Sequence, residues 1–384
     1  MPRKIAVVVT ARPSYSRIKT ALRAIDEHPD LELQLVAAAS ALLSRYGNAS
    51  KVMEQDGFTI AARVFNVLEG GNLAAQAKTT GLGIIELANV FERLAPDAVV
   101  TVADRFETMS TAIAASYLNI PLVHIQGGEV TGNIDEKVRH AITKLSDLHF
   151  VASKKAQQRV IKMGESADKV FQTGCPSIDL AAEVAADFSL DFDPYEKYGG
   201  VGATPDFTTG YLVVMQHPVT TEYGTSRQHI EETLEAIHAL KVPTFWFWPN
   251  VDAGSDGTSN GIRAFRERHD IEYVHFFKNM RPNDFLKVLK NSRCLIGNSS
   301  VGIRECSFLG VPVVNIGSRQ AGRERSENII DVDYDRNAIQ AAISTQRVKG
   351  SYAPNHIYGN GNAGKKIADL LAKEPLTYHK ILQY

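Results

Sequence analysis

The chain has 384 residues, an ordinary globular composition and a formal net charge of −1 at pH 7. At roughly 150 residues per domain, this length predicts two or three domains. Acidic and basic residues are interspersed, which argues against a nucleic-acid-binding patch or a polybasic membrane segment. An anionic ligand must therefore be met by a local site rather than by the overall charge.

The cysteines and the N-terminus give no sign of a metal, a disulfide or a membrane. Cys175, Cys294 and Cys306 form no CxxC motif or Cys/His cluster, so we expect small core side chains and no metal site. The apolar run near the N-terminus is short and followed by charge, which predicts a first strand rather than a signal peptide. No apolar run approaches the length of a membrane span, so we expect a cytoplasmic protein.

Short apolar runs alternate with segments of helical period in the first half of the chain. Buried strands are predicted at residues 4–10, 31–39, 97–103, 120–126 and 147–153, and helices at 16–28, 72–94, 105–119 and 135–146. Strands that alternate with helices imply right-handed crossovers and a mostly parallel sheet.

A second alternation follows a segment at 187–210 that is rich in Gly, Pro, Asp and aromatic residues, and that we predict to be a linker or an irregular domain start. Strands are then predicted at 211–218, 243–250, 271–277, 293–300 and 311–317, with a helix at 226–241. The prediction is an α/β chain of two doubly wound domains, residues 1–186 joined by a C-terminal helix 362–384, and residues 187–361. In such sheets ligands bind outside the carboxyl ends of the strands.

Two strand ends of the first half carry polar candidates. Arg12 and Ser16 follow the first strand, where they either contact an anion at a helix N-terminus or belong to an ordinary capped helix. Asp104 and Arg105 follow the strand at 97–103. An aspartate there is a helix N-cap, a catalytic acid or base, or both.

The segment HIQGGEVTGNIDEKVRH combines glycines with many ionisable groups. It contains Gln126 and Glu129, and it places Asp135 and Arg139 four residues apart on one predicted helix face. A surface ion pair of little energetic weight is the alternative for these two. The glycines allow positive φ or close backbone approach, which favours a loop shaped around a small molecule.

The second half carries candidates for phosphate and ribose recognition. After a buried strand, LIGNSSVGIRE offers serines and a helix N-terminus to a phosphate, and Glu305 is placed to reach vicinal hydroxyls. Further candidates follow other strands. They are His217, Asn250, Asp252 and Arg319.

With these motifs in order, the chain resembles the hydrolysing UDP-N-acetylglucosamine 2-epimerases of sialic-acid biosynthesis, within the GT-B-type epimerase superfamily. The resemblance runs nearly end to end. It rests on ARPSYSR, RYGNASKVMEQDGF, DRFETM, HIQGGEVTGNIDEKVRHAITKLSDLHF, GCPSID, QHPVTT, PNVDAGSDG, IGNSSVGIRE, GSRQAGRE and IYGNGNA.

The resemblance implies a GT-B fold, two Rossmann-like domains facing across a cleft, and a homodimer or homotetramer. It also implies a reaction: UDP-N-acetylglucosamine and water give N-acetylmannosamine and UDP, through elimination to 2-acetamidoglucal and rehydration, without a cofactor. The implied partner is the nucleotide-sugar. Residues implied to bind it are Arg12, Ser16, Arg105, Gln126, Asn250, Asp252, Ser299, Ser300, Glu305 and Arg319. Those implied to take part in catalysis are Asp104, Glu129, Asp135, Arg139 and His217.

Position 126 departs from part of the family, in which some relatives carry glutamate. Gln126 cannot act as a general base, so the base is sought among Asp104, Glu129 and Asp135. Our preference is Asp104 and Asp135, with Arg139 orienting Asp135. Alternatives left open are a GDP-linked or 4-acetamido-6-deoxy substrate, a non-hydrolysing epimerase, a GT-B glycosyltransferase and a catalytically silent binding module.

Overall fold

The chain folds into two compact α/β units. The computed structural model describes residues 1–44, 47–68, 73–102, 105–131, 134–249 and 255–383. Unit 1 comprises Met1–Glu129, Ile134–Asp179 and Ile357–Tyr384, and unit 2 comprises Val130–Asn133 and Leu180–His356. Each unit is described by itself.

Unit 1 is built on a parallel sheet of seven strands in the order β3-β2-β1-β4-β5-β6-β7. The strands are β1 Arg3–Val9, β2 Leu31–Ala38, β3 Ile60–Val64, β4 Ala98–Val102, β5 Leu122–Ile125, β6 Leu148–Val151 and β7 Val170–Gln172. Consecutive buried Val, Ile, Ala and Leu residues suit strands covered on both faces. The chain runs outward from β1 to β3 and returns to β4 beside β1, so the strand order reverses between β1 and β4.

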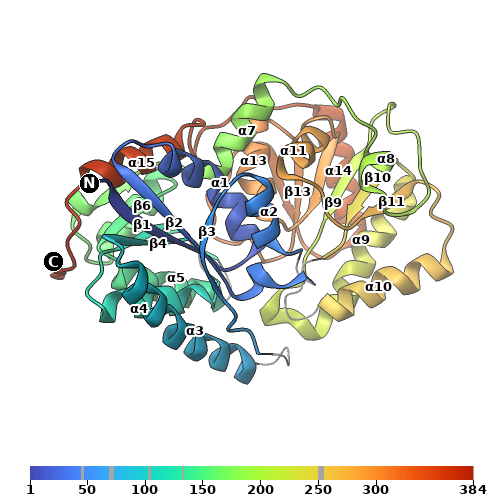
Figure 1. The fold of residues 1–384 in the computed structure, drawn as a ribbon. Helices are drawn as coiled ribbons and strands as arrows, with labels where there is room; N and C mark the ends of the chain where they lie inside the picture. The colour runs from blue at the N-terminus through green and yellow to red at the C-terminus, as the bar shows by residue number, and fades with distance from the viewer. Residues whose placement is uncertain (45–46, 69–72, 103–104, 132–133, 250–254, 384) are drawn as a thin grey trace. The chain divides into compact units, whose positions relative to one another are not determined.

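Helices cover both faces of this sheet (Figure 1). One core joins the sheet to α1 Arg12–Asp26, α2 Ala49–Gln55 and α15 Ala363–Lys373, and the opposite core joins it to α3 Leu73–Leu94, α4 Thr108–Tyr117 and α5 Ile134–Leu145. The remaining helical segments of the unit are η1 Ala39–Leu42, α6 Lys154–Lys162, η3 Ala167–Lys169 and the start of α7 Pro176–Ala186, which continues into unit 2.

The C-terminal helix α15 is fixed to unit 1 at both of its ends. The Asp179 carboxylate accepts hydrogen bonds from the backbone N–H groups of Ala363 and Gly364, at 2.8 and 2.7 Å. The Arg3 guanidinium donates to the carbonyls of Leu371 and Glu374, both at 2.8 Å. These bonds satisfy end groups that a helix leaves without partners, and they place the apolar face of α15 against the α1 core.

Unit 2 contains a second seven-stranded sheet, in the order β14-β13-β12-β9-β10-β11-β8. Its strands are β8 Val201–Gly202, β9 Leu212–Met215, β10 Thr244–Phe247, β11 Val274–Phe277, β12 Cys294–Gly297, β13 Val313–Ile316 and β14 Ile329–Val332. All pairs are parallel except β8 with β11. The order reverses between β9 and β12, which are neighbours although β10 and β11 separate them in sequence.

Three helices of unit 2 pack on one face of its sheet through a shared core, α9 Ser226–Leu240, α10 Ser255–Arg268 and α14 Arg336–Lys349. The others are α8 Pro194–Tyr198, η4 Thr220–Thr225, α11 Pro282–Lys290, α12 Ser300–Ile303 and α13 Glu305–Leu309. Trp246, Phe265 and Phe276 fill the interior of this unit, where their large apolar surfaces are almost fully buried.

The predicted α/β fold with two doubly wound halves is confirmed. Each of the ten predicted strands contains a strand of the structure, while β3, β7, β8 and β14 were not predicted. The segment at 187–210, predicted as a linker or irregular start, holds α8 and β8. All three cysteines are buried in the protein interior, as predicted.

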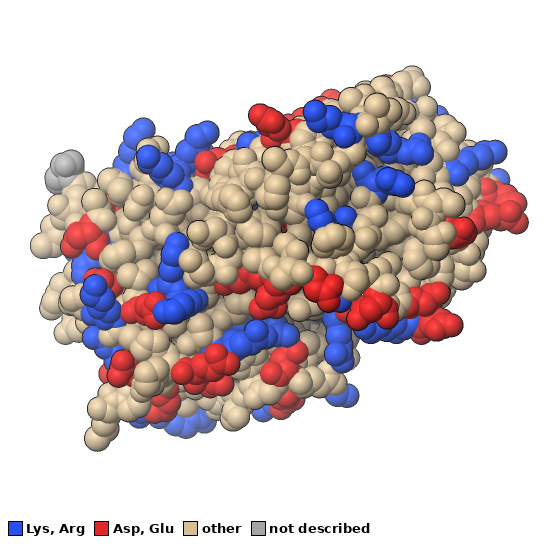
Figure 2. Space-filling view, turned by 90° about the horizontal axis from the view of Figure 1, so that it is seen from above, with Lys and Arg blue, Asp and Glu red and all other residues tan. Residues whose placement is uncertain are grey.

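The surface of the described chain carries mixed charge. Figure 2 shows basic and acidic side chains interspersed over the visible face, in keeping with the near-zero net charge of the sequence. Among the residues that the structure describes, no helix is both long and apolar enough to cross a membrane.

Candidate active site

In an open parallel sheet, ligands bind at the carboxyl ends of the strands where the strand order reverses. In unit 1 this point lies between β1 and β4, and in unit 2 between β9 and β12. Predicted site residues follow all four of these strands.

Arg12 begins α1, directly after β1. Its guanidinium lies against Gly47, where a Cβ atom would come within 2.5 Å of Nη1, and burial lowers the pKa of Arg12. The N-cap residue Ala11 makes no side-chain capping hydrogen bond, and Ser16 Oγ donates to the Arg12 carbonyl at 3.3 Å. The alternative of an ordinary capped helix is therefore wrong, because the N-cap residue has no side chain that could cap α1.

Arg105 follows β4 and is held by a carboxylate that the sequence analysis did not single out. Its Nε and Nη2 atoms donate to the two oxygens of Glu107, at 3.2 and 3.3 Å. Glu107 is only 2% exposed and also accepts from Ser40 Oγ at 3.5 Å. Ser40 Oγ also lies 2.9 Å from the Thr10 carbonyl oxygen, so its single proton is shared between the two acceptors.

Glu107 thus joins three strand ends of unit 1, those of β1, β2 and β4. The sequence signal was its place three residues after Asp104 within DRFETM. Asp104 itself lies outside the described residues, so its predicted role remains a prediction.

Gln126 directly follows β5 and has a left-handed conformation, with φ at +69°. The residue is 2% exposed, and its Nε2 atom donates to Cys175 Sγ at 2.9 Å. Cys175 Sγ lies 3.0 Å from Ser177 Oγ. A non-glycine residue in this conformation is strained, and such strain often occurs at functional sites.

Arg139 of α5 is fully buried and contacts two groups at the helix start. Its Nη1 atom donates to the Glu129 carbonyl at 2.7 Å and to Glu136 Oε2 at 3.0 Å. The alternative of a solvent-exposed Asp135–Arg139 pair is wrong, because the arginine has no exposed surface. Glu136 also contacts His140 Nε2, at 2.8 Å. Asp135 is partly buried in the first turn of α5.

The glycines after β5 serve protein packing. A Cβ atom at Gly128, where φ is +75°, would lie 2.4 Å from the Ala156 carbonyl oxygen. One at Gly127 would lie 2.9 Å from Nδ1 of the buried His124. As predicted, these glycines allow close approach and, at Gly128, a positive φ; the groups that approach them are α6 and the β5 histidine. That the loop is shaped around a small molecule stays a prediction. Gly132 lies outside the described residues.

The far end of α5 is held by a buried ionic network. Glu165, 4% exposed, accepts from Lys144 Nζ and Lys380 Nζ at 2.6 Å each and from His149 Nε2 at 3.0 Å. Burial acts to raise the pKa of Glu165, but these three hydrogen bonds outweigh burial and lower it to about 2. Burial lowers the pKa of His149 despite its carboxylate partner, which favours neutral imidazole beside ionised Glu165. Lys380 also donates to the Ser146 carbonyl at 2.5 Å.

The corresponding point of unit 2 centres on Asn298, which directly follows β12. Its Oδ1 atom accepts from the His217 backbone N–H and its Nδ2 atom donates to the His217 carbonyl, both at 2.8 Å. The Asn298 carbonyl accepts from Arg319 Nη1 at 3.2 Å and from Gln320 Nε2 at 2.9 Å. His217 and Arg319, predicted separately from the sequence, are thereby joined through one residue.

Ser299 is the N-cap of α12 and accepts a hydrogen bond from the Val301 N–H at 3.4 Å, so its capping role is real. Ser300 begins α12, a helix of only four residues that stops before Arg304. Glu305 begins α13 and is 9% exposed. The helix that follows β12 therefore starts at Ser300, and a break at Arg304 divides it into the short segments α12 and α13. Asn250 and Asp252 lie outside the described residues.

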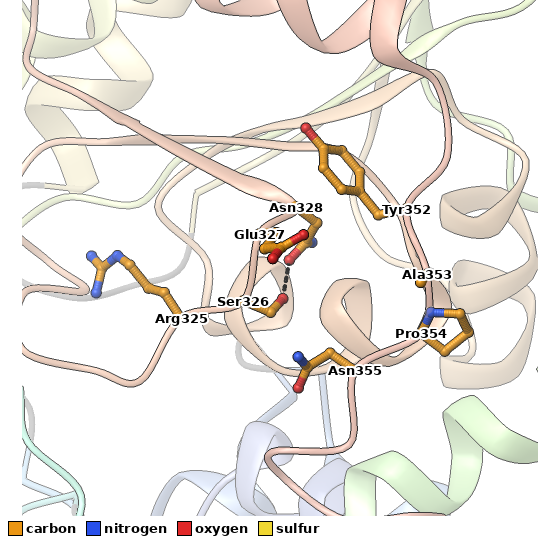
Figure 3. A pocket seen from close by; sticks show the side chains of 8 residues that line it. All are labelled: Arg325, Ser326, Glu327, Asn328, Tyr352, Ala353, Pro354 and Asn355. Atoms are coloured by element: carbon orange, nitrogen blue, oxygen red, sulfur yellow. Dashed lines mark hydrogen bonds between the residues drawn. The ribbon is translucent and has the colours of Figure 1, made fainter.

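A separate pocket of about 520 Å³ lies elsewhere in unit 2 (Figure 3). It is lined by Arg325, Ser326, Glu327, Asn328, Tyr352, Ala353, Pro354 and Asn355. The side chains of Ser326 and Asn328 point toward each other and are hydrogen-bonded, and Arg325 binds Asp331 at 2.7 Å. Of the residues implied to bind the nucleotide-sugar or to act on it, none lines this pocket, although Arg325 follows the same strand as Arg319. The pocket is therefore distinct from the strand-end site.

The family follows from comparison with known proteins. The family model described as UDP-N-acetylglucosamine 2-epimerase matches residues 23–372. The chain therefore belongs to the UDP-N-acetylglucosamine 2-epimerase family. The predicted resemblance is confirmed at the level of this family.

Individual relatives of the family cover nearly the whole chain. The UDP-N,N'-diacetylbacillosamine 2-epimerase (hydrolyzing) of Legionella pneumophila is 33% identical over 98% of this chain and 97% of its own. The polysialic acid biosynthesis protein P7 of Escherichia coli is 34% identical over 89% and 85%. The structure of Neisseria meningitidis UDP-GlcNAc 2-epimerase bound to UDP-GlcNAc has a TM-score of 0.78 at 18% identity, covering 97% of this chain and 100% of that one. Its likeness supports the GT-B fold.

Family membership makes the chain an enzyme of the UDP-N-acetylglucosamine 2-epimerase family, and its strand ends offer matching chemistry. Buried Glu107 and Glu129 lie near arginines, and Arg319 lies beside the start of a helix. Carboxylates serve as acids and bases, while guanidinium groups and helix starts stabilise phosphate charge. Among the described residues, no three His, Cys, Asp or Glu side chains gather as metal ligands.

Proposed function

We propose that the chain is a hydrolysing UDP-N-acetylglucosamine 2-epimerase, which converts UDP-N-acetylglucosamine and water to N-acetylmannosamine and UDP. The observation that carries the proposal is the position of the predicted residues. Six of them follow strands that lie at or beside the two points where the strand order reverses. They are Arg12, Arg105, His217, Ser299, Ser300 and Arg319. Family membership supplies the reaction type.

In the proposed mechanism, unit 1 residues act on the sugar and unit 2 residues hold the nucleotide. A base removes the C2 proton as the C1–oxygen bond to UDP breaks, which forms 2-acetamidoglucal. Water then adds at C1 and a proton is delivered to C2 from the opposite face. Arginine side chains and the start of α12 offset the charge that develops on the leaving diphosphate.

Gln126 is not the base in this proposal, because an amide has no proton-accepting role near neutral pH. Asp104 and Asp135 are proposed as the working carboxylates, with Glu129 as the third candidate. Arg139 is proposed to orient Asp135; its bonds to Glu129 and Glu136 hold the guanidinium at the start of α5.

This assignment predicts that Asp104→Asn and Asp135→Asn each lower kcat far more than they raise KM. Steady-state kinetics on both variants provides the measurement. The control is Asp97→Asn, directly before β4 and outside the proposed set, where the carboxylate accepts from the Lys4 N–H. If both variants keep near-native turnover, the assignment is wrong.

The second candidate substrate is UDP-N,N'-diacetylbacillosamine, because the Legionella relative is named for it and covers nearly the whole chain. The test is a panel of UDP- and GDP-linked acetamido sugars, with both the released nucleotide and the released sugar identified. Free UDP with N-acetylmannosamine supports the proposal. An epimerised nucleotide-sugar without free UDP supports a non-hydrolysing enzyme, and turnover of the diacetylated donor alone supports the second substrate.

A further inference from the structure

Asn298 extends the pairing of β9 and β12 beyond the point where backbone pairing stops. The last paired residue of β12 is Gly297, whose φ of +128° turns the chain away and where a Cβ atom would lie 2.2 Å from the Met215 carbonyl oxygen. The Asn298 side chain then takes over, with one hydrogen bond to each backbone polar group of His217. An amide side chain presents one donor face and one acceptor, as a peptide group does.

The backbone of the same residue receives a second pair of bonds. Arg319 Nη1 and Gln320 Nε2 both donate to the Asn298 carbonyl, and Gln320 is 2% exposed. Three segments of unit 2 therefore meet on Asn298: the end of β9, the loop from β12 to α12, and the loop after β13. Each of them carries a residue proposed above to hold the nucleotide.

We propose that Asn298 is a positioning residue of the nucleotide subsite, which sets the backbone at His217 and the guanidinium of Arg319 relative to the start of α12. This inference rests on the proposed function, since it concerns UDP. Asn298 has no exposed surface, so it acts through these neighbours rather than by binding the ligand. The buried side-chain amide makes two of these hydrogen bonds and the backbone carbonyl accepts the other two, and any shift of the residue leaves buried polar groups without partners.

The chain offers a matched control in Asn328, a second buried asparagine of unit 2. Its Nδ2 atom donates to the Val311 carbonyl at 2.7 Å, and its Oδ1 atom accepts from Ser307 Oγ at 3.1 Å. Asn328 is 2% exposed and contacts no residue proposed to bind the nucleotide. Replacing either asparagine with alanine removes a comparable set of buried side-chain hydrogen bonds.

The test measures the affinity for UDP by calorimetry and the melting temperature, on the wild-type chain and on Asn298→Ala and Asn328→Ala. Both variants are expected to melt at a lower temperature. Only Asn298→Ala is expected to lose affinity for UDP, by about tenfold or more. Equal UDP affinity in the two variants would overturn the inference, whatever their melting temperatures. A wild-type chain that binds no UDP would instead overturn the proposed function.

A measurement on the wild-type chain covers the case in which Asn298→Ala does not fold. Hydrogen–deuterium exchange with and without saturating UDP is expected to slow at the backbone N–H of His217 and in the loop at 317–320. Peptides around Asn328 are expected to exchange at the same rate in both conditions. Unchanged exchange at His217 and at 317–320, with UDP bound, contradicts the inference.

Discussion

Replacing Glu165 with glutamine is expected to destabilise the protein at neutral pH and to remove part of its sensitivity to acid. Glutamine keeps the shape of the protonated carboxyl group but leaves Lys144 and Lys380 without the buried charge that both contact. The pKa of Glu165 falls from 4.5 to about 2 on folding. At 1.36 kcal/mol per pKa unit, the ionised carboxylate contributes up to about 3 kcal/mol. Lys144 is 39% exposed, so solvent screening reduces the value toward about 2 kcal/mol.

The pH dependence follows from the direction of this shift. A carboxylate whose pKa is lower in the folded state stabilises the fold fully above its unfolded pKa of 4.5, and this stability is lost as the pH falls toward 2. The difference in unfolding free energy between wild type and Glu165→Gln is therefore expected to be constant from pH 7 to about pH 5.5. By pH 3 it should shrink to about 1 kcal/mol.

Urea unfolding followed by circular dichroism, repeated at several pH values, measures this difference. The control is Glu54→Gln, which removes a solvent-exposed pair with Arg63 in the same unit and should cost at most about 1 kcal/mol. Equal urea midpoints for the two variants at pH 7 would refute the reasoning. So would a difference between wild type and Glu165→Gln that stays constant down to pH 3.

Two further predictions concern unit 1. Glu107→Gln should weaken the hydrogen bonds that fix the Arg105 guanidinium. A loss of about 1.5 kcal/mol in a charged hydrogen bond corresponds to a decrease of about tenfold in kcat/KM. Unchanged steady-state kinetics would contradict this prediction. Gly128→Ala should lower both the melting temperature and kcat, because the new Cβ atom meets the Ala156 carbonyl at 2.4 Å and φ is positive. Gly81→Ala is the control, since its Cβ atom meets nothing within 4 Å inside α3, and the same loss in both variants would show that the contact is unimportant.

The strands that were predicted from the sequence have a local sequence signal in common. The runs over β1, β4 and β9 are continuous and apolar because both faces of those strands are covered, and such runs stand out in the sequence. The missed strands β3 and β14 lie at sheet edges: β3 alternates exposed residues with buried or half-buried ones, and β14 has only half-buried and exposed residues. β8 has only two residues and is set by its antiparallel pairing with β11, a tertiary contact without a local signal.

Site residues were predictable from the sequence where their role depends on following a strand. They were less predictable where their role depends on contacts with residues far away in the sequence. Arg139 was found from its spacing, but its burial and its contact with the Glu129 carbonyl arise from the fold of the whole loop. Glu107 was not named from the sequence, and Asn298 was considered only as part of a capping motif with the two serines that follow it. Their importance lies in bonds to strands far away in the sequence.

The docking of α15 affects the order in which the two units are completed during synthesis. The last helix completes the core beneath α1, and Arg3 in the first strand binds the carbonyls at the end of that helix. During synthesis, Leu180–His356 is available as a nearly continuous unit before residues 357–384 leave the ribosome. Unit 1, whose first residues are synthesised before unit 2, is therefore completed only after unit 2. Until then the apolar surface that receives Ile367 and Leu371 lacks its cover, and transiently exposed apolar surface favours aggregation.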